Sequence, residues 1–180
     1  AREIRQHLAE LGFRPAAFEV NQPPQPDPSS HGLDAIEFSF GPNPGEPLKP
    51  LRQIASSGEI SRVMLSIKSA LARQDQTPLM VFDEIDANVG GEVARAVGEK
   101  MAILGGAHQV VAITHFPQVA ALASQHFLVE KTVAEGRTTS SLKEVRGDER
   151  IAELTRMLGG QSEEARLMAK SLLTSAPVSA

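Results

Sequence analysis

Apolar and polar positions along the chain first follow a helical period close to the amino terminus. Residues 1–12 place Ile4, Leu8 and Leu11 on one helical face among charged neighbours. This spacing predicts a stub helix, which would be either a short packed helix or the end of a coiled coil.

The next segment favours extended structure over helix. Residues 21–30 contain four prolines and are expected to form an irregular connector. Residues 34–40 then alternate between apolar and polar positions, which predicts a half-buried strand, and a turn-rich stretch over 41–45 ends it. The apolar side of that strand carries Ile36, Phe38 and Phe40.

From residue 56 onward the pattern alternates between helix and strand. It predicts a helix over 60–71, a strand over 79–82, a helix over 93–104 and a strand over 110–113. Both strands are short continuous apolar runs, so we expect them to be buried on both faces. A crossover through a helix joins parallel strands, and open α/β sheets bind ligands beyond the carboxyl ends of their strands. Asp83-Glu84 and Thr114-His115 follow the two strands directly, so we expect them at one edge of the sheet.

The remaining residues predict a smaller set of elements and a loose end. The expected elements are a short helix starting near Pro117, a hairpin over 127–142 that turns at Glu135-Gly136, and helices over 148–158 and 162–173. As domains, we expect the stub at 1–12, one lobe over 13–175 and a tail at 176–180.

The dipeptide Asp83-Glu84 follows four apolar residues, which is the arrangement of a Walker B segment. In such a segment the first carboxylate holds Mg²⁺, usually through water, and the second orients or deprotonates the water that attacks a γ-phosphate. A solvated acidic loop at a strand end would contain the same two residues. The dipeptide alone favours neither interpretation.

A serine-rich turn, Ser56-Ser57-Gly58-Glu59, lies where the chain enters the helix over 60–71. Free backbone N–H groups and the positive end of the helix dipole attract phosphate at such a position. Ser56 and Glu59 also have the spacing of a capping box, which is favourable without any ligand. In isolation the capping interpretation is the simpler one, and the acidic strand one helix further along favours a phosphate-binding turn.

His115 is the histidine with a candidate role, because it follows a strand on the same sheet edge as Glu84. A lone histidine at a strand end is more often a packing or surface residue. We assign that simpler interpretation to His7, His31, His108 and His126.

Composition removes several classes of function. The sequence has no cysteine, which excludes disulfides and cysteine-based zinc sites and fits a cytoplasmic protein. Its net charge of −4 means that any DNA contact needs a local basic patch or other parts of a longer protein. The apolar runs are too short to cross a bilayer, so no membrane partner is expected. Because the chain begins with Ala1 and not methionine, we expect it to be part of a longer protein.

Together these segments resemble the ATP-binding cassette head of the RecN family, a family of bacterial DNA-repair ATPases. The resemblance covers about residues 33–160, and the order of serine-glycine turn, acidic pair and histidine is the order of the cassette superfamily. The motifs that carry it are Asn43-Pro44-Gly45-Glu46, Ala55-Ser56-Ser57-Gly58-Glu59, Ser61-Arg62, Asp83-Glu84-Ile85-Asp86 and Thr114-His115-Phe116-Pro117-Gln118-Val119-Ala120.

This resemblance implies an α/β fold, namely the carboxy-terminal lobe of a P-loop NTPase-like head with a mostly parallel sheet and flanking helices. It implies that Asp83 binds Mg²⁺, that Glu84 and His115 are catalytic, and that Asp86 begins the loop through which two heads communicate. The turn Ser56-Ser57-Gly58-Glu59 would correspond to the signature motif, which binds ATP held by a second head.

Two departures from the family pattern qualify these roles. Ser57 replaces the first of two usual glycines, so its side chain is expected to crowd the phosphate, and a glycine there is expected to maintain or strengthen ATP-driven head pairing. No glycine is followed by lysine, so the phosphate-cradling Walker A loop is missing. We therefore expect the chain alone to bind ATP weakly and not to hydrolyse it.

The resemblance also implies partners. They are an N-terminal Walker A lobe of the same protein, a second head that forms a homodimer, and DNA for the full-length protein, which would act in double-strand break repair at the nucleoid. A non-catalytic dimerisation or docking module with a degenerate nucleotide site stays open as an alternative. A transporter cassette is a third interpretation, and the stub and the flanking motifs count against it.

Overall fold

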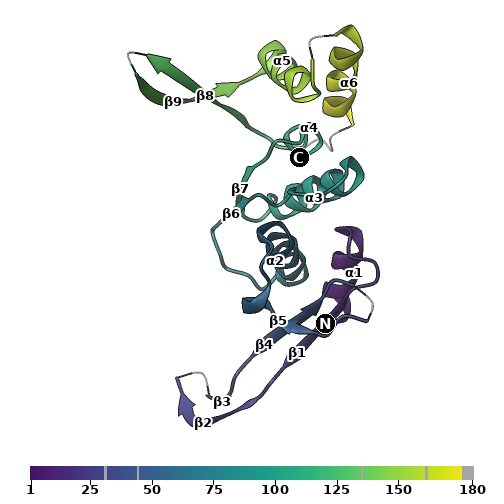
Figure 1. Cartoon of the computed structure of the whole chain (residues 1–180), viewed down its shortest axis with the longest axis vertical. Helices are drawn as coiled ribbons and strands as arrows, with labels where there is room; N and C mark the ends of the chain where they lie inside the picture. Colours follow the sequence, from purple (N-terminus) through teal and green to yellow (C-terminus); the bar gives the residue numbers. More distant parts are fainter. Residues whose placement is uncertain (31, 44, 135, 161, 176–180) are drawn as a thin grey trace. The chain divides into compact units, whose positions relative to one another are not determined.

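The computed structural model describes residues 1–30, 32–43, 45–134, 136–160 and 162–175 of the 180-residue chain (Figure 1). The chain divides into two compact units, Ala1–Ile113 and Thr114–Ala180. The domain boundaries expected from the sequence stay predictions, and the expected tail at 176–180 lies outside the described residues.

The first unit combines three helices with short strands. Its elements are α1 (Arg2–Glu10), β1 (Ala17–Asn21), β2 (Pro24–Ser29), β3 (Gly32–Asp34), β4 (Glu37–Gly41), β5 (Lys49–Pro50), the 3₁₀-helix η1 (Leu51–Gln53), α2 (Ser57–Leu71), β6 (Leu79–Asp83), α3 (Gly91–Leu104) and β7 (Gln109–Ile113). Strands β1, β4 and β5 form an antiparallel sheet in that order.

Helix α1 lies where the apolar spacing of residues 1–12 predicts a helix, and it packs against α2. Ile4 and Leu8 on its inner face are buried in the main core of this unit. That core is completed by Phe13, Phe18, Phe40, Val63 and Ile67. Burying two large aliphatic side chains contributes roughly 1.5–3 kcal/mol each, so the described stub is held by packing.

The prediction of an irregular connector over residues 21–30 was wrong. Residues Pro24–Ser29 form β2, which pairs with β3 in a two-stranded antiparallel ribbon. The pairing is irregular between its two ends. Prolines cannot donate a ladder hydrogen bond, but a two-stranded ribbon leaves one edge of each strand unpaired, so extended proline-rich chain is tolerated there.

The predicted strand over 34–40 exists as β4 but begins three residues later, at Glu37. Phe40 is buried in the core and Phe38 packs against it, as expected. Ile36 precedes the strand and is 67% exposed, so its predicted place on the apolar side was wrong.

Strands β6 and β7 are parallel, as the crossover through α3 predicts. Asp83 and Ile113, the last residues of the two strands, are paired in register. The expectation that both strands are buried on both faces was wrong for the described residues, since their side chains alternate between a covered and an uncovered face. The uncovered face carries Leu79, Val81, Val111 and Ile113. The other sheets of the described residues are antiparallel, so the expected mostly parallel sheet is limited to this one pair.

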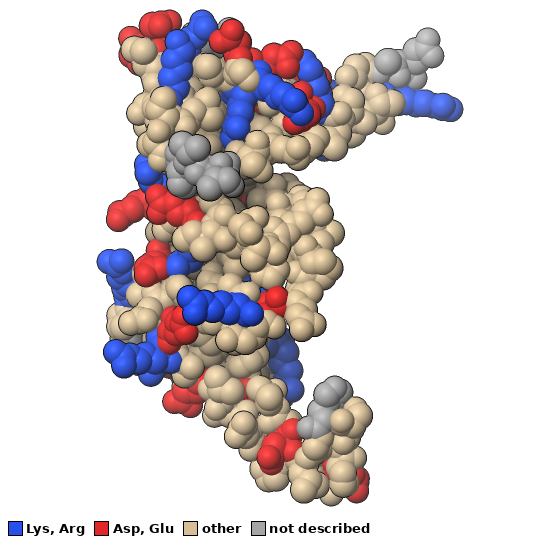
Figure 2. Space-filling model, turned by 180° about the vertical axis from the view of Figure 1, so that it is seen from behind, with Lys and Arg blue, Asp and Glu red and all other residues tan. Residues whose placement is uncertain are grey.

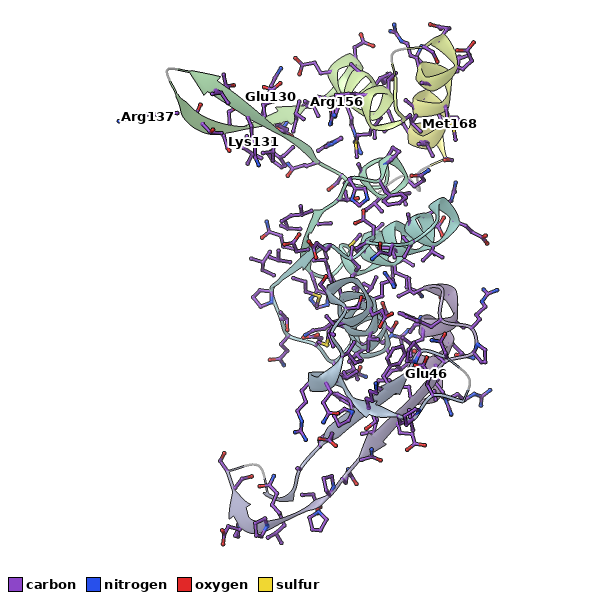
Figure 3. All side chains as sticks on the ribbon, in the orientation of Figure 1. Glu46, Glu130, Lys131, Arg137, Arg156 and Met168 are labelled. Atoms are coloured by element: carbon purple, nitrogen blue, oxygen red, sulfur yellow. The ribbon has the colours of Figure 1, made fainter. Side chains whose placement is uncertain are left out.

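The second unit contains the elements expected in the last third of the chain. They are α4 (Pro117–Ala120), β8 (His126–Ala134), β9 (Arg137–Val145), α5 (Gly147–Met157) and α6 (Glu163–Thr174). Helices α4, α5 and α6 enclose a small core of Ala120, Ala121, Leu154 and Ala169. Strands β8 and β9 form the predicted antiparallel hairpin, with exposed charged side chains such as Glu130, Lys131 and Arg137 along it (Figure 3). Of its predicted turn, Glu135 lies outside the described residues, and Gly136 has a positive φ of 75°.

Candidate functional site

The turn that begins α2 has the capped geometry expected from Ser56 and Glu59. Ser56 is the N-cap residue, with extended backbone, and its Oγ accepts a hydrogen bond of 3.3 Å from the backbone N–H of Glu59. Helix α2 begins at Ser57, three residues before the predicted start at residue 60. Capping uses only one of the N–H groups that a helix start leaves without an intrahelical partner. The turn therefore keeps the features that attract phosphate.

Gly58 lies against the segment that follows β6. A Cβ atom at this position would lie 3.2 Å from the Cβ of Ala87 and 3.2 Å from the backbone oxygens of Ala87 and Glu84. Two of those neighbours are backbone atoms, which cannot rotate away. A glycine at position 58 thus permits a close contact between the start of α2 and residues 84–87.

Residues 84–88 form a tight loop at the end of β6. Glu84 and Asn88 both have positive φ, 53° and 59° respectively, and the backbone N–H of Ala87 donates to the Glu84 carbonyl at 3.0 Å. A left-handed conformation costs a non-glycine residue roughly 1–2 kcal/mol and persists only where the surroundings maintain it. Asp83 and Glu84 both have exposed side chains at this point.

Arg62 on α2 anchors this loop by hydrogen bonds to its backbone. Its Nη1 donates to the carbonyls of Ile85 and Ala87, both at 3.2 Å, and its guanidinium lies 5.0 Å from the ring centroid of Phe13. Arg62 is 7% exposed, and Asp86 in the loop is fully buried. Burial lowers the pKa of Arg62, and the charges of Glu59 and Asp86 act in the opposite direction.

Two serines complete the contact between α2 and the acidic segment. Ser57 Oγ donates to Glu84 Oε2 at 2.6 Å, and Ser61 Oγ donates to the Asp83 carbonyl at 3.2 Å. The sequence predicts Ser57 beside a phosphate of another head. Its bond to Glu84 within the same unit has no counterpart in the sequence pattern, since it depends on how α2 packs beside β6.

His115 lies in the second unit, two residues after the end of β7. Its side chain is exposed and its ring centroid lies 4.7 Å from that of Phe116, while the Phe116 N–H donates to Thr114 Oγ1 at 2.9 Å. The structure thus unites the signature-like turn with the acidic pair inside the first unit. A common pocket for Glu84 and His115 stays a prediction.

Two of the four remaining histidines, His7 and His108, have contacts of the packing kind. His7 Nδ1 lies 2.7 Å from Lys100 Nζ, and His108 Nδ1 lies 2.9 Å from the Thr77 carbonyl. His126 is half-buried, and its Nδ1 is buried without a hydrogen-bond partner among the described residues. His31 lies outside the described residues.

A polar hollow of about 350 Å³ adjoins His126 inside the second unit, next to the start of α5. Arg150 lines it and donates from Nη2 to the carbonyls of Ala120, Ala121 and Ala123, at 3.0, 3.2 and 2.6 Å. Burial is the main cause that lowers the pKa of His126, followed by the charge of Arg150. Arg150, on α5, thus holds the end of α4.

The donor set fits a Mg²⁺ ion that is held mainly by nucleotide. Among the described residues, no group of three or more acidic, histidine or cysteine side chains could enclose a metal ion. Mg²⁺ bound to a nucleotide needs only one or two carboxylates and keeps several waters, so the exposed carboxylate of Asp83 is of the right kind. Within the same described part of the chain, no helix is both long and apolar enough to span a membrane.

Arg62 is the functional residue whose role the sequence analysis missed, since it appeared there only as part of a motif. A signal for it exists in the spacing of α2. Arg62 and Ser66 lie one turn apart and are both buried, beside the apolar Val63 and Ile67. A charged residue on a buried helix face needs a specific partner, and here the partners are the carbonyls of the loop after β6.

Comparison with known proteins points to one family. The chain is 44% identical over 160 residues to the DNA repair protein RecN of Deinococcus radiodurans, a match that covers 89% of the chain and 28% of that protein. It is 44% identical to RecN of Bacillus subtilis over 73% of the chain and 23% of the relative, and 41% identical to RecN of Rickettsia bellii over 98% of the chain and 32% of the relative. The chain therefore spans about a quarter to a third of the length of these relatives. No protein-family model matches it.

Solved structures agree on the fold. The Smc head domain with a coiled coil and joint from Pyrococcus yayanosii matches 95% of the chain and 28% of that structure, with a TM-score of 0.61 and 18% identity. A structure from work on the ATP-driven dimerization and DNA-stimulated activation of SMC ATPases matches 89% of the chain and 92% of its own length, with a TM-score of 0.52 and 19% identity. The chain belongs to the RecN family and has the fold of part of an SMC-type ATPase head.

Proposed function

We propose that the chain is the carboxy-terminal lobe of an ATP-hydrolysing, SMC-like head that pairs with a second head on binding ATP and acts in DNA double-strand break repair. The relatives are DNA repair proteins, and the fold is that of SMC ATPase heads. Hydrolysis, pairing and DNA action belong to a protein longer than this chain. Its Walker A lobe would come from another part of that protein.

The proposed roles of the site residues follow from their chemistry. Asp83 would hold Mg²⁺ through water, and Glu84 would orient or deprotonate the water that attacks the γ-phosphate. His115 would stabilise the charge that develops on the transferred phosphoryl group. When bound, Mg²⁺ would neutralise charge on the phosphates. Phosphoryl transfer relies mainly on positioning and electrostatic stabilisation, so the main task of these side chains is to be held in place.

The turn that begins α2 would bind the nucleotide of the second head. Backbone N–H groups at a helix start and the helix dipole are suited to a phosphate oxygen. Asp86, fully buried in the loop after β6, would fix the shape of that loop at the contact between heads. A turn that binds one nucleotide and a loop that acts on another would then form one rigid body.

One observation carries the proposal, namely the docking of that turn onto the acidic loop. Gly58 allows close backbone approach, and Arg62 holds two loop carbonyls. Glu84 is maintained in a strained left-handed conformation in the same loop. A plain helix cap and a solvated acidic loop would need none of these three features.

The exposed apolar side chains on one face of β6 and β7 support the proposal that a second lobe packs against this face. The exposed residues of this face are Leu79, Val81, Val111 and Ile113. Figure 2 shows few charged side chains over the middle of the chain, where these strands lie. A groove of about 300 Å³ along β6 is lined by further apolar residues of α2, Ile60 and Met64. Contiguous apolar surface of this kind marks an interaction site, and we propose that the Walker A lobe of the same protein covers it.

The Glu84→Gln variant tests the proposal. ATP turnover is measured in a head that has been completed with its Walker A lobe. The amide keeps the size of the side chain but is a far weaker base, so ATP binding should persist while hydrolysis falls by at least about a hundredfold. Glu92→Gln is the matched control, because Glu92 is an exposed carboxylate in the first turn of α3, outside the site. It should leave turnover unchanged. Normal turnover in Glu84→Gln would remove Glu84 from its proposed role. Absence of turnover in the unmodified completed head would favour the non-catalytic docking module.

A further inference from the structure

The shortest polar contact of the site joins its two motifs within one head. Ser57 Oγ donates to Glu84 Oε2 at 2.6 Å across 27 positions of sequence. Both side chains are exposed, so the bond is not imposed by burial. Ser57 occupies a place in the turn where the family pattern has glycine, and a glycine has no hydroxyl to make this bond.

We propose that Ser57 is a positioning residue that restrains Glu84 until the turn at α2 engages nucleotide. This inference rests on the proposed function of Glu84 as the group that activates water. It adds a regulatory contact, in which the occupancy of a head's own turn decides whether its carboxylate is free to act.

The number of hydrogens that Ser57 can donate supports this restraint of Glu84. A serine hydroxyl has a single hydrogen to donate, and a carboxylate oxygen can only accept it. Ser57 therefore cannot donate to Glu84 and to a phosphate oxygen at the same time. A γ-phosphate that arrives at the turn from the opposing head competes with Glu84 for this proton, and its success releases the carboxylate.

The surroundings allow release without refolding the loop. The backbone of residues 84–87 is anchored to α2 by Arg62 and by the close approach of Gly58. The exposed Glu84 side chain is the part that can rotate. A rotamer change of an exposed side chain takes picoseconds to nanoseconds, so the restraint can respond within each catalytic cycle.

The test measures ATP turnover per head, in the completed protein, at concentrations too low for heads to pair. Removing one exposed hydrogen bond of about 1 kcal/mol should raise this basal rate about fivefold in Ser57→Ala. Ser57→Thr keeps a hydroxyl and should retain the low basal rate. Ser140→Ala is the matched control, because Ser140 is an exposed serine on β9, outside the site, and its basal rate should equal that of the unmodified protein.

A basal rate in Ser57→Ala that is unchanged or reduced would overturn the restraint, as would an equal rise in Ser57→Thr. The ATP concentration at half-maximal rate serves as a second measurement, because a change limited to the rate separates release of Glu84 from altered binding. Glu84→Gln in the same assay keeps the two proposals apart. If that variant is inactive and Ser57→Ala behaves as the unmodified protein, only the restraint fails. If Glu84→Gln hydrolyses ATP normally, the proposed role of Glu84 fails.

Discussion

The guanidinium of Arg62 is expected to stabilise the loop after β6 by about 3 kcal/mol. Two hydrogen bonds from a charged donor contribute roughly 1.5–3 kcal/mol each, and both lie at the low end here because they share Nη1 and measure 3.2 Å. The contact with the Phe13 ring adds about 0.5–1 kcal/mol. The cost of burying the cation offsets part of this sum.

Arg62→Met tests this value, since methionine fills a similar volume without charge or donors. Loss of the guanidinium should leave the carbonyls of Ile85 and Ala87 without this donor, and Asp86 buried beside a neutral side chain. The loop should then open more readily. Amide hydrogen exchange at Ala87, whose N–H donates to the Glu84 carbonyl, should show about a hundredfold loss of protection, because each 1.4 kcal/mol is tenfold.

Arg95→Met is the control in the same unit. Arg95 lies on α3 and pairs with Glu99 at 2.9 Å on the exposed surface, where such pairs contribute at most about 1 kcal/mol. Protection at Ala87 should be unchanged in this variant. If Arg62→Met leaves Ala87 equally protected, the guanidinium does not maintain the loop, and the origin of the strained Glu84 backbone must lie elsewhere.

Two further predictions concern the turn at α2 and the second unit. Gly58→Ala places a Cβ 3.2 Å from backbone oxygens of Glu84 and Ala87. Thermal denaturation should therefore show that the free energy of unfolding falls by roughly 1–3 kcal/mol, and ATP turnover should fall with it. Unchanged stability would mean that the loop can move away. Burial, with a smaller effect of Arg150, lowers the pKa of His126. At pH values between this lowered pKa and the ordinary pKa of about 6.5, the folded protein therefore binds fewer protons than the unfolded chain. Stability of the second unit should therefore decrease as the pH falls through this interval, and melting curves of His126→Gln should depend less on pH; an equal dependence in both proteins would refute the assignment.

Helices and crossover topology were readable from the sequence because their signals are local. The spacing of Val93, Val97 and Met101, followed by two glycines, predicts α3 closely, and the helix ends at Leu104. Strands β2 and β3 were missed, since prolines between Asn21 and Ser30 outweigh the extended pattern that an isolated ribbon can adopt. Strand β1 was also missed, and it is defined by its pairing with β4. A register irregularity in that ribbon has no sequence signal.

Burial of β6 was misjudged for a different reason. A continuous apolar run shows that both faces of a strand are suited to burial, but it does not say which element covers each face. Met80 and Phe82 are covered within the unit, whereas Val81 is 60% exposed.

In the candidate site, too, the residue types were predictable from the sequence but their contacts were not. Ser56, Asp83 and Glu84 could be singled out because their types and spacing carry known chemistry. The bonds from Ser57 to Glu84 and from Arg62 to the loop carbonyls depend on the packing of α2 beside β6. That packing involves residues more than twenty positions apart, and no local rule specifies it.

We propose that Glu84 and His115 act on one nucleotide. A structure of the completed, paired head with a non-hydrolysable ATP analogue and Mg²⁺ tests it most directly. We expect the Glu84 carboxylate and the His115 ring both to lie within about 3 Å of the γ-phosphate or of the water in line with it. Side chains directed into separate regions, with the γ-phosphate contacted by neither, would contradict it.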